Sequence, residues 1–356
     1  MITRVDRYLA RALLGYGALV LAVLVALVSL FTFIGQQDDI GTGSYDLRGA
    51  FAYTLLSIPQ QVFEMLPIAA LIGAILGLGA LARDSELTVL RAAGLSPLRL
   101  GGAAAMAGAV VMVAMWTIGE YVAPPADQYA RQIKIFGKFS EFNAAGSRSS
   151  WAKDGSLLMN IQQQTAGNMF GGVFVFELAP DRSLARVIRA DRAVDLGASG
   201  WRLENYAETR FGGGRVEAER APLRELAVEL NRDFVGLAVV SPDSLPVHGL
   251  RGYVRHLKAN GLESQAYEVA MWARVARTVS AVLVCVLAVP FALGPLRSSG
   301  AGARTVAGVL LGVTYFLVNR TLENSAQVYD IEPLVAAWAP TAVLAGIAAV
   351  AYARLR

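Results

Sequence analysis

Six stretches of this chain carry almost no charge, and each is close to the length that a helix needs to cross a lipid bilayer. A spanning helix takes roughly 20 mostly apolar residues for a hydrocarbon core of ~30 Å. The first stretch is too long for a signal-peptide core and lacks a small-residue cleavage site. We therefore predict six transmembrane helices. The stretches lie between Arg11 and Asp38, Glu64 and Arg83, Arg99 and Glu120, Arg277 and Arg297, Arg304 and Arg320, and Glu332 and Arg354.

The charged residues are concentrated in one part of the chain. Only 17% of the residues are charged, against about 25% in soluble domains. Residues 123–270 hold 18 of the 32 Lys and Arg residues and 17 of the 28 Asp and Glu residues. This distribution excludes a disordered chain and an ordinary soluble protein. It indicates a membrane protein with one polar insert between the third and fourth helices.

The short segments between the predicted helices differ in charge, which predicts their orientation. One set of short segments carries ten basic and three acidic residues, and the opposite loops carry two basic and six acidic residues. We therefore expect both termini in the cytoplasm of a bacterium and the insert in the periplasm. Cys285 is the only cysteine, so no disulfide can form within the chain. The ten basic residues are Arg4, Arg7, Arg11, Arg83, Arg91, Arg99, Arg297, Arg304, Arg354 and Arg356.

The insert has the two-residue repeat of half-buried strands. Trp201 and Leu203 alternate with charged residues, and Leu226, Val228 and Leu230 alternate with Glu225, Ala227 and Glu229. Turn signals at 154–155, 171–172, 198–200 and 212–214 separate these runs. This pattern predicts an antiparallel β-domain of sandwich or jelly-roll type over about 140–240. A helical repeat over 250–257 then predicts a return helix that stops at 260–261.

A few residues inside or at the ends of the predicted helices have special physical properties. Glu64 lies about 20 residues before Arg83, which places it near the outer interface as a hydrated carboxylate rather than a proton relay. The fifth stretch has only 15 uncharged residues, so Arg320 must reach the interface, face protein or line a wet cavity. Other residues affect helix shape or packing. They are Pro59 and Pro67, expected to bend or break the second helix, and Gly73, Gly77, Gly308 and Gly312, which allow close helix contacts.

The sequence contains no recognisable catalytic or cofactor motif. There is no GxxxxGK[ST] loop to hold nucleotide phosphates, no HExxH and no cysteine cluster. The two histidines, His248 and His256, both lie in the polar insert, where surface or core roles are commoner than metal ligation. We therefore expect a chain that is not an enzyme by itself and that carries no cofactor.

A short charged segment, residues 83–97, joins the second and third predicted helices. Asp84 or Ser85 can cap a helix, Glu86 suits its first turn, and Gly94 can end it. On such a helix Leu87, Leu90 and either Ala93 or Gly94 share one face. That face would expose apolar surface in the cytoplasm. It predicts either a docking site for a partner or a helix that rests on lipid headgroups.

Several motifs together resemble a known family, the LptF/LptG permeases of the lipopolysaccharide-export ABC transporter, and its LptG branch more closely than its LptF branch. The similar motifs follow one another in order over nearly the whole chain. They are Asp6-Arg7-Tyr8, residues 43–46 (GSYD), 53–59 (YTLLSIP), 77–82 (GLGALA), 85–87 (SEL), 91–94 (RAAG), 119–124 (GEYVAP), 151–155 (WAKDG) and 291–298 (FALGPLRS).

The resemblance implies a domain organisation for the whole chain. Residues 1–125 would form transmembrane helices one to three with a cytoplasmic coupling helix at about 84–95. Residues 126–265 would form a periplasmic β-jelly-roll domain with a helical return segment, and residues 266–356 would form helices four to six. The expected fold is thus an α-helical membrane protein with an inserted antiparallel β-domain. It would lie in the bacterial inner membrane.

The resemblance also implies partners. The chain would pair with an LptF-like permease above two LptB-like ATPase subunits, which would bind ATP and Mg. LptC-like and LptA-like bridge proteins would receive lipopolysaccharide from the β-domain, and no nucleic acid would bind. Glu86 matches the family's acidic position in the coupling helix. The residues expected to contact the ATPase are Ser85, Glu86, Leu87, Leu90, Arg91 and Gly94.

Lipopolysaccharide combines acyl chains with anionic phosphates, so its path needs apolar walls and a few cations. In the family the first and fifth helices form lateral gates. In this chain the first helix offers Phe31 and Ile34 for such a gate, and the fifth helix offers Tyr315 and Phe316. The expected cations are Arg131 and Lys134, which match basic positions in the family, and Arg320. Each also has a simpler reading as a helix-end residue that reaches the interface. Unlike related permeases, this chain has no basic residue at 32–35.

Three functions follow from these observations. The leading one is a permease subunit that extracts lipopolysaccharide from the outer leaflet of the inner membrane, powered by ATP hydrolysis in a separate subunit, with the LptF role as a variant. The second is a permease-like scaffold that transmits ATPase motion to a periplasmic envelope enzyme. The third is a membrane-embedded enzyme that acts on lipid, which the missing catalytic set disfavours.

Overall fold

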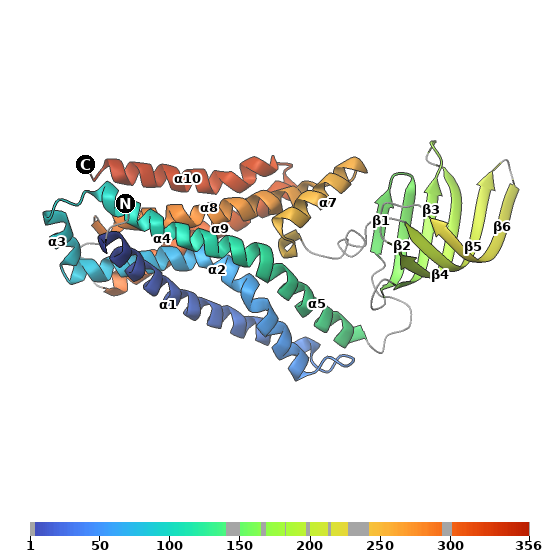
Figure 1. Ribbon diagram of the computed structural model, residues 1–356, viewed down its shortest axis with the longest axis horizontal. Helices are drawn as coiled ribbons and strands as arrows, with labels where there is room; N and C mark the ends of the chain where they lie inside the picture. The colour runs from blue at the N-terminus through green and yellow to red at the C-terminus, as the bar shows by residue number, and fades with distance from the viewer. Residues whose placement is uncertain are drawn as a thin grey trace. The chain divides into compact units, whose positions relative to one another are not determined.

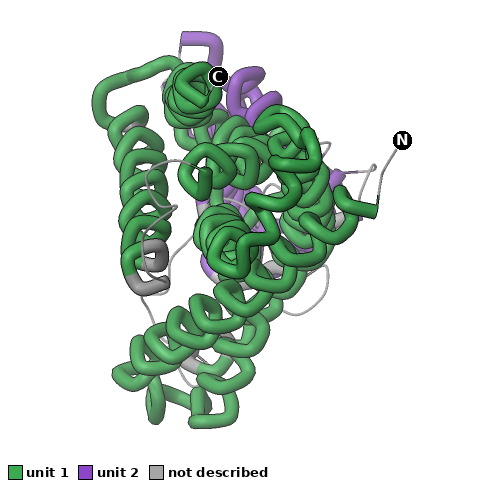
Figure 2. Tube along the Cα trace, turned by 90° about the vertical axis from the view of Figure 1, so that its left-hand side faces the viewer, with its two compact units in different colours: residues 1–142, 242–251, 264–356 green, residues 143–241, 252–263 purple. Residues whose placement is uncertain are grey.

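The computed structural model describes residues 4–139, 150–164, 169–181, 183–196, 200–212, 215–226, 242–293 and 301–355. The chain forms two compact units (Figure 2). The helical unit comprises residues 1–142, 242–251 and 264–356, and the β unit comprises residues 143–241 and 252–263. The helical unit therefore extends beyond the predicted boundary at 125, because a polar helix continues the third membrane helix. It also includes residues 242–251, where the predicted return helix begins.

Six helices of the described residues are long and apolar enough to cross a membrane, as predicted. Both ends of the chain lie at the α3 end of the helical unit (Figure 1). The long helices are α1 (Arg4–Ile34), α2 (Leu47–Arg83), α4 (Pro97–Thr117), which the π-helical turn η2 (Ile118–Val122) and α5 (Ala123–Phe139) continue, α8 (Gln265–Leu293), α9 (Ala301–Val328) and α10 (Pro333–Ala353). The short ones are η1 (Gln37–Asp39), α3 (Glu86–Ala92), η4 (Pro242–Ser244) and α7 (Val247–Ala259).

The α2 helix is the centre of the helical unit, because it is apolar on all sides and its residues 66–75 are buried. Two glycines bring α1 and α2 together: a Cβ atom at Gly73 would lie 2.3 Å from the Cα atom of Gly17. On the α9 side, a Cβ atom at Gly312 would lie 3.0 Å from the Ile68 side chain. The predicted glycines therefore mark close helix contacts. The two prolines lie inside one continuous helix, so of the expected bend or break, the break does not occur.

The β unit contains one antiparallel sheet, which confirms the predicted β-domain. Its six described strands pair in the order β1 to β6, each with the next along the chain. This order is that of a meander, whereas the predicted jelly-roll requires pairing between strands distant in sequence. The predicted strand residues Val228 and Leu230 lie outside the described residues. The strands are β1 (Ser150–Asp154), β2 (Leu157–Gln164), β3 (Met169–Leu178), β4 (Leu184–Asp195), β5 (Trp201–Gly212) and β6 (Arg215–Leu226).

Glycines in the sheet serve two purposes. Gly155, with a φ of +55°, makes the turn between β1 and β2, as predicted. Gly172 lies inside β3 with a φ of +60°, opposite a skip in the pairing of β2 with β3. Glycine adopts this backbone conformation without strain, and the register of β3 with β2 is the same on both sides of Gly172. The turn expected at 171–172 was therefore wrong.

One face of the sheet is apolar. Side chains that alternate along β2 to β5 point to this face and form the core of the β unit. Trp201, Leu203 and Val173 are at most 1% exposed. The core of the β unit is therefore built without a disulfide, in agreement with the single buried cysteine in α8.

Candidate functional site

Three membrane helices carry charged residues at a similar distance from the α3 end of the helical unit. Glu64 precedes Arg83, the end of α2, by 19 residues, and Arg277 precedes Leu293, the end of α8, by 16 residues. Arg320 follows Ala301, the start of α9, by 19 residues. At a rise of 1.5 Å per residue, these distances correspond to about 24–29 Å, close to the thickness of a hydrocarbon core. The charges therefore lie at the far interface rather than at the bilayer centre.

These charges surround a pocket of about 150 Å³ between α2, α8 and α9. Arg277 forms a two-pronged ion pair with Glu323, with Nη2 lying 2.9 Å from Oε1 and 2.8 Å from Oε2. Arg320 Nη1 lies 3.9 Å from the same carboxylate. The pocket therefore combines an aromatic wall with fixed charges. It is lined by Glu64, Pro67, Ile68, Arg277, Tyr315, Phe316, Asn319, Arg320 and Glu323.

The structure brings together three of the seven residues predicted to contact lipid. Tyr315, Phe316 and Arg320 all line the pocket. The buried Tyr315 hydroxyl forms no hydrogen bond within the described part of the chain, so it can still donate one to a ligand. Phe31 and Ile34 are 63% and 45% exposed at the end of α1 and do not line this pocket.

Beside the pocket, the turn η4 and the start of α7 bring the chain back to the helical unit. We call residues 242–248 the return segment. Glu120 of η2 binds its end: the carboxylate accepts hydrogen bonds from the backbone N–H groups of Val247 at 2.8 Å and His248 at 3.2 Å. The His248 ring Nδ1 lies 2.6 Å from Glu120 Oε1. Glu120 therefore caps the N-terminus of α7, where a negative charge is favourable.

Arg274 of α8 holds the return segment from the other side. Its guanidinium donates hydrogen bonds to three backbone carbonyls, those of Leu245 at 2.6 Å, Gly119 at 2.7 Å and Asp243 at 3.2 Å. It also lies 4.8 Å from the centre of the Phe63 ring. Arg274 is only 6% exposed, so these contacts are buried. Neither Glu120 nor Arg274 was predicted as a site residue, although a charged residue next to an apolar helix is a signal for such a role.

The three predicted cations are each held by an acidic residue. Arg320 Nη1 lies 3.4 Å from Asp243 Oδ2, and Lys134 Nζ lies 2.7 Å from Asp39 Oδ2. Arg131 binds Asp127 one helical turn before it, with 2.8 Å between Nε and Oδ2.

Arg131 also donates to the Ser244 hydroxyl at 2.8 Å. Two of the three predicted cations, Arg131 of α5 and Arg320 of α9, thus contact neighbouring residues of the turn η4. Lys134 lies one turn beyond Arg131 and does not contact η4; it stands 5.3 Å from the centre of the Tyr53 ring.

The α3 helix at the opposite end of the unit differs from its prediction in which residues it exposes. Leu87 is 3% exposed and belongs to the helical core, and Leu90 is half-buried against that core. The expectation that these leucines face the solvent was therefore wrong: the chain itself covers them. Val89, at 65% exposed, is the large apolar residue that α3 presents to the outside.

Other residues predicted in this segment lie around α3. Glu86 begins the helix, and its carboxylate accepts a hydrogen bond of 2.5 Å from the Tyr8 hydroxyl of α1. Gly94 has a φ of +91° and ends the segment as predicted. Ser85 precedes the helix but has a φ of 61° and makes no capping hydrogen bond, so the predicted serine cap was wrong. Arg91 is exposed.

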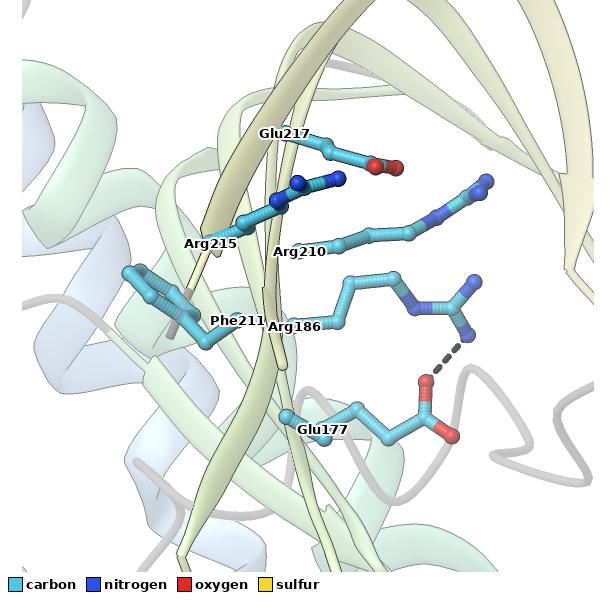
Figure 3. A pocket seen from close by; sticks show the side chains of 7 residues that line it. Glu177, Arg186, Arg210, Phe211, Arg215 and Glu217 are labelled. Carbon is cyan, nitrogen blue, oxygen red and sulfur yellow. Dashed lines mark ion pairs between the residues drawn. The ribbon is translucent and has the colours of Figure 1, made fainter. Parts of the chain in front are cut away.

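The β unit has a polar hollow of about 470 Å³ at one end of its apolar face. Figure 3 shows Glu177, Arg186 and Arg210 pointing to the same side of the sheet, while Phe211 points away. Beneath them lies Glu208, which is 1% exposed. It accepts hydrogen bonds from Arg186, from Arg210 at 2.5 Å and from Arg224. The hollow therefore carries charges of both signs, three arginines and two glutamates, at one end of the apolar face.

Comparison with known proteins identifies the family. The family model for "Lipopolysaccharide export system permease LptF/LptG" matches residues 7–354. The lipopolysaccharide export system permease protein LptG of Escherichia coli K12 is 31% identical over 339 residues, which cover 95% of this chain and 94% of the relative. The LptG protein of Haemophilus influenzae is 28% identical over 342 residues, 96% of each chain. The chain therefore belongs to the LptF/LptG family of lipopolysaccharide export system permeases.

Proposed function

We propose that this chain is the LptG-type permease subunit of a lipopolysaccharide-export ABC transporter in the bacterial inner membrane. It takes lipopolysaccharide from the outer leaflet and passes it to its β-domain in the periplasm. The observation that carries this proposal is the pocket at the far interface, where Tyr315 and Phe316 form an apolar wall beside Arg320. Membership of the LptF/LptG family supports the substrate.

The pocket and its surroundings suit the headgroup region of an anionic lipid. Guanidinium groups bind phosphates through paired, charge-assisted hydrogen bonds, and apolar walls accept the first methylenes of acyl chains. Arg131 and Arg320 each contact a residue of η4, and both are partly exposed, so a phosphate can reach them. The remaining apolar surface for the acyl chains comes from the exposed residues of α1, including Phe31 and Ile34, and from an LptF-like partner.

Energy reaches the chain from outside. ATP and Mg are bound by two copies of a separate LptB-like ATPase on the cytoplasmic side, where both termini and α3 lie. The α3 helix supports this role because it exposes Val89 together with Ala92 and Ala93, an apolar strip next to the acidic Glu86. LptC-like and LptA-like bridge proteins accept the lipid from the β-domain.

Copurification tests the proposal as a whole. The chain is expressed with its LptF-like and LptB-like partners, purified in detergent, and analysed for bound lipid by mass spectrometry. We expect a complex with the ATPase that carries lipopolysaccharide in preference to the more abundant glycerophospholipids. Copurification with the ATPase and a periplasmic enzyme but without lipopolysaccharide would instead support the scaffold function.

Substitution of Val89 by aspartate tests the contact with the ATPase. Only a minority of interface residues contribute more than about 1 kcal/mol to the binding free energy. A charge that is buried in an interface without a partner, in contrast, costs several kcal/mol. We therefore expect Val89→Asp to reduce the ATPase activity of the assembled complex at least about tenfold, with the folded chain unchanged. Leu98→Asp, at a residue of similar exposure at the start of α4, is the matched control. Equal ATPase rates for the wild type and Val89→Asp would remove α3 from the interface.

A further inference from the structure

We propose that Asp243 is an in-chain placeholder for the lipid phosphate: its carboxylate occupies Arg320 until an anionic headgroup displaces it. This inference rests on the proposed function, because it assumes that Arg320 meets the headgroup. It adds a residue that sets specificity, since only a ligand with an anion next to its apolar part can replace the carboxylate. The ligand chemistry is a phosphomonoester attached to acyl chains.

The contacts of the return segment fall into a fixed set and an exchangeable set. The fixed set is buried and uses the backbone: Arg274 binds carbonyls of the segment, and Glu120 binds its N–H groups. The exchangeable set lies at the rim and uses side chains. Arg320 and Asp243 are 50% and 46% exposed and share a single contact of 3.4 Å. The backbone of the segment is thus held in place while the side chain of Asp243 is free to leave Arg320.

The strength of the rim contact suits exchange. A half-exposed, single-pronged ion pair contributes at most about 1 kcal/mol, because water and salt screen it. A phosphate offers more oxygens and more charge to a guanidinium than one carboxylate does, so it wins the competition. A neutral headgroup brings no charge and leaves Asp243 in place.

The other carboxylate near Arg320 cannot play this part. Glu323 lies 3.9 Å from Arg320, but both of its oxygens already bind Arg277, and its side chain is 9% exposed. Removing Glu323 from Arg277 would leave two charges buried without partners, which costs several kcal/mol. Asp243, in contrast, lies in a turn of three residues, and its departure leaves no buried charge.

Displacement of Asp243 also involves the neighbouring residue. Ser244 accepts a hydrogen bond from Arg131, the second predicted phosphate contact. A phosphate that binds Arg131 therefore also replaces a side-chain contact with η4, as one that binds Arg320 does. The segment that connects the helical unit with the rest of the chain thus changes its side-chain contacts only when the site is filled.

Lipopolysaccharide binding to the purified complex in phosphatidylcholine nanodiscs tests the inference. We expect Asp243→Asn to tighten the apparent affinity up to ~5-fold, the equivalent of one surface ion pair removed from competition. Asp330→Asn is the matched control, because Asp330 forms no ion pair within the described residues and asparagine tolerates its φ of 52°. The double variant Asp243→Asn with Arg320→Gln is expected to lose the gain.

The outcomes separate the inference from the proposed function. If the wild-type complex binds no lipopolysaccharide, the proposed function fails. If the wild type binds but Asp243→Asn binds equally or more weakly, the placeholder is refuted and the function stands. A gain that persists without Arg320, or that Asp330→Asn reproduces, refutes it as well. Competition by millimolar inorganic phosphate as effective as that by lipid would show that the site takes free phosphate instead.

Discussion

Replacement of Arg274 by methionine is expected to lower the free energy of unfolding of the helical unit by at least about 3 kcal/mol. Methionine fills a similar volume but donates no hydrogen bond, so the buried carbonyls of Leu245, Gly119 and Asp243 lose their common donor. Each buried polar group left without a partner costs about 1–3 kcal/mol. Thermal unfolding of the full chain in detergent, followed by intrinsic fluorescence, measures this loss.

Two further variants separate the role of Arg274 from a general effect of lost charge. Arg251→Met removes an exposed arginine near the start of α7 that makes no ion pair in the described structure, and we expect it to leave stability unchanged. Arg274→Met combined with Glu120→Gln is expected to cost less than the sum of the two single changes, because both residues hold the same segment. Fully additive losses would show that the two contacts are independent.

Replacement of Glu208 by glutamine is expected to destabilise the β unit by about 3 kcal/mol. Removal of one partner from a buried ion pair costs 3–5 kcal/mol, and we expect the lower end because the three arginines are partly exposed. Amide hydrogen exchange of the full chain measures this loss of stability, which we expect to appear as faster exchange in β4 to β6. Glu204→Gln, on the same strand and without an arginine partner among the described residues, is the control. Unchanged exchange in the Glu208 variant would show that the ion pairs of Glu208 do not stabilise the β unit.

The six membrane helices could be predicted because each is an uninterrupted apolar run, and the bilayer sets its length. The third helix was predicted too short. Its continuation, α5, is amphipathic and contains Arg131 and Lys134, so it does not differ from a polar insert in average hydropathy. Lys134 and Arg131 of this helix contact Asp39 and Ser244, which lie far away in the sequence and are known as partners only once the helices are packed.

The α3 segment shows a second limit of sequence patterns. Periodicity correctly placed Leu87 and Leu90 on one face, but it does not tell whether the same chain covers that face. In the same way, composition identified Arg320 as a cation near the interface, but its carboxylate partner Asp243 lies 77 positions away. Pairings over such distances depend on the packing of helices, which a single sequence does not encode locally.

The π-helical turn η2 has a consequence for the length of related sequences. A π-turn is an α-helix with one inserted residue, so it widens the turn and releases carbonyls from the usual pairing. Here the carbonyl of Gly119 is taken by Arg274. Deletion of one residue between 118 and 122 would keep the facing of α4 and α5 but withdraw this carbonyl and Glu120 from the return segment. Relatives that lack this residue are therefore expected to lack an arginine at the position of Arg274. In an alignment, the one-residue gap between 118 and 122 and the substitution at 274 would occur in the same sequences.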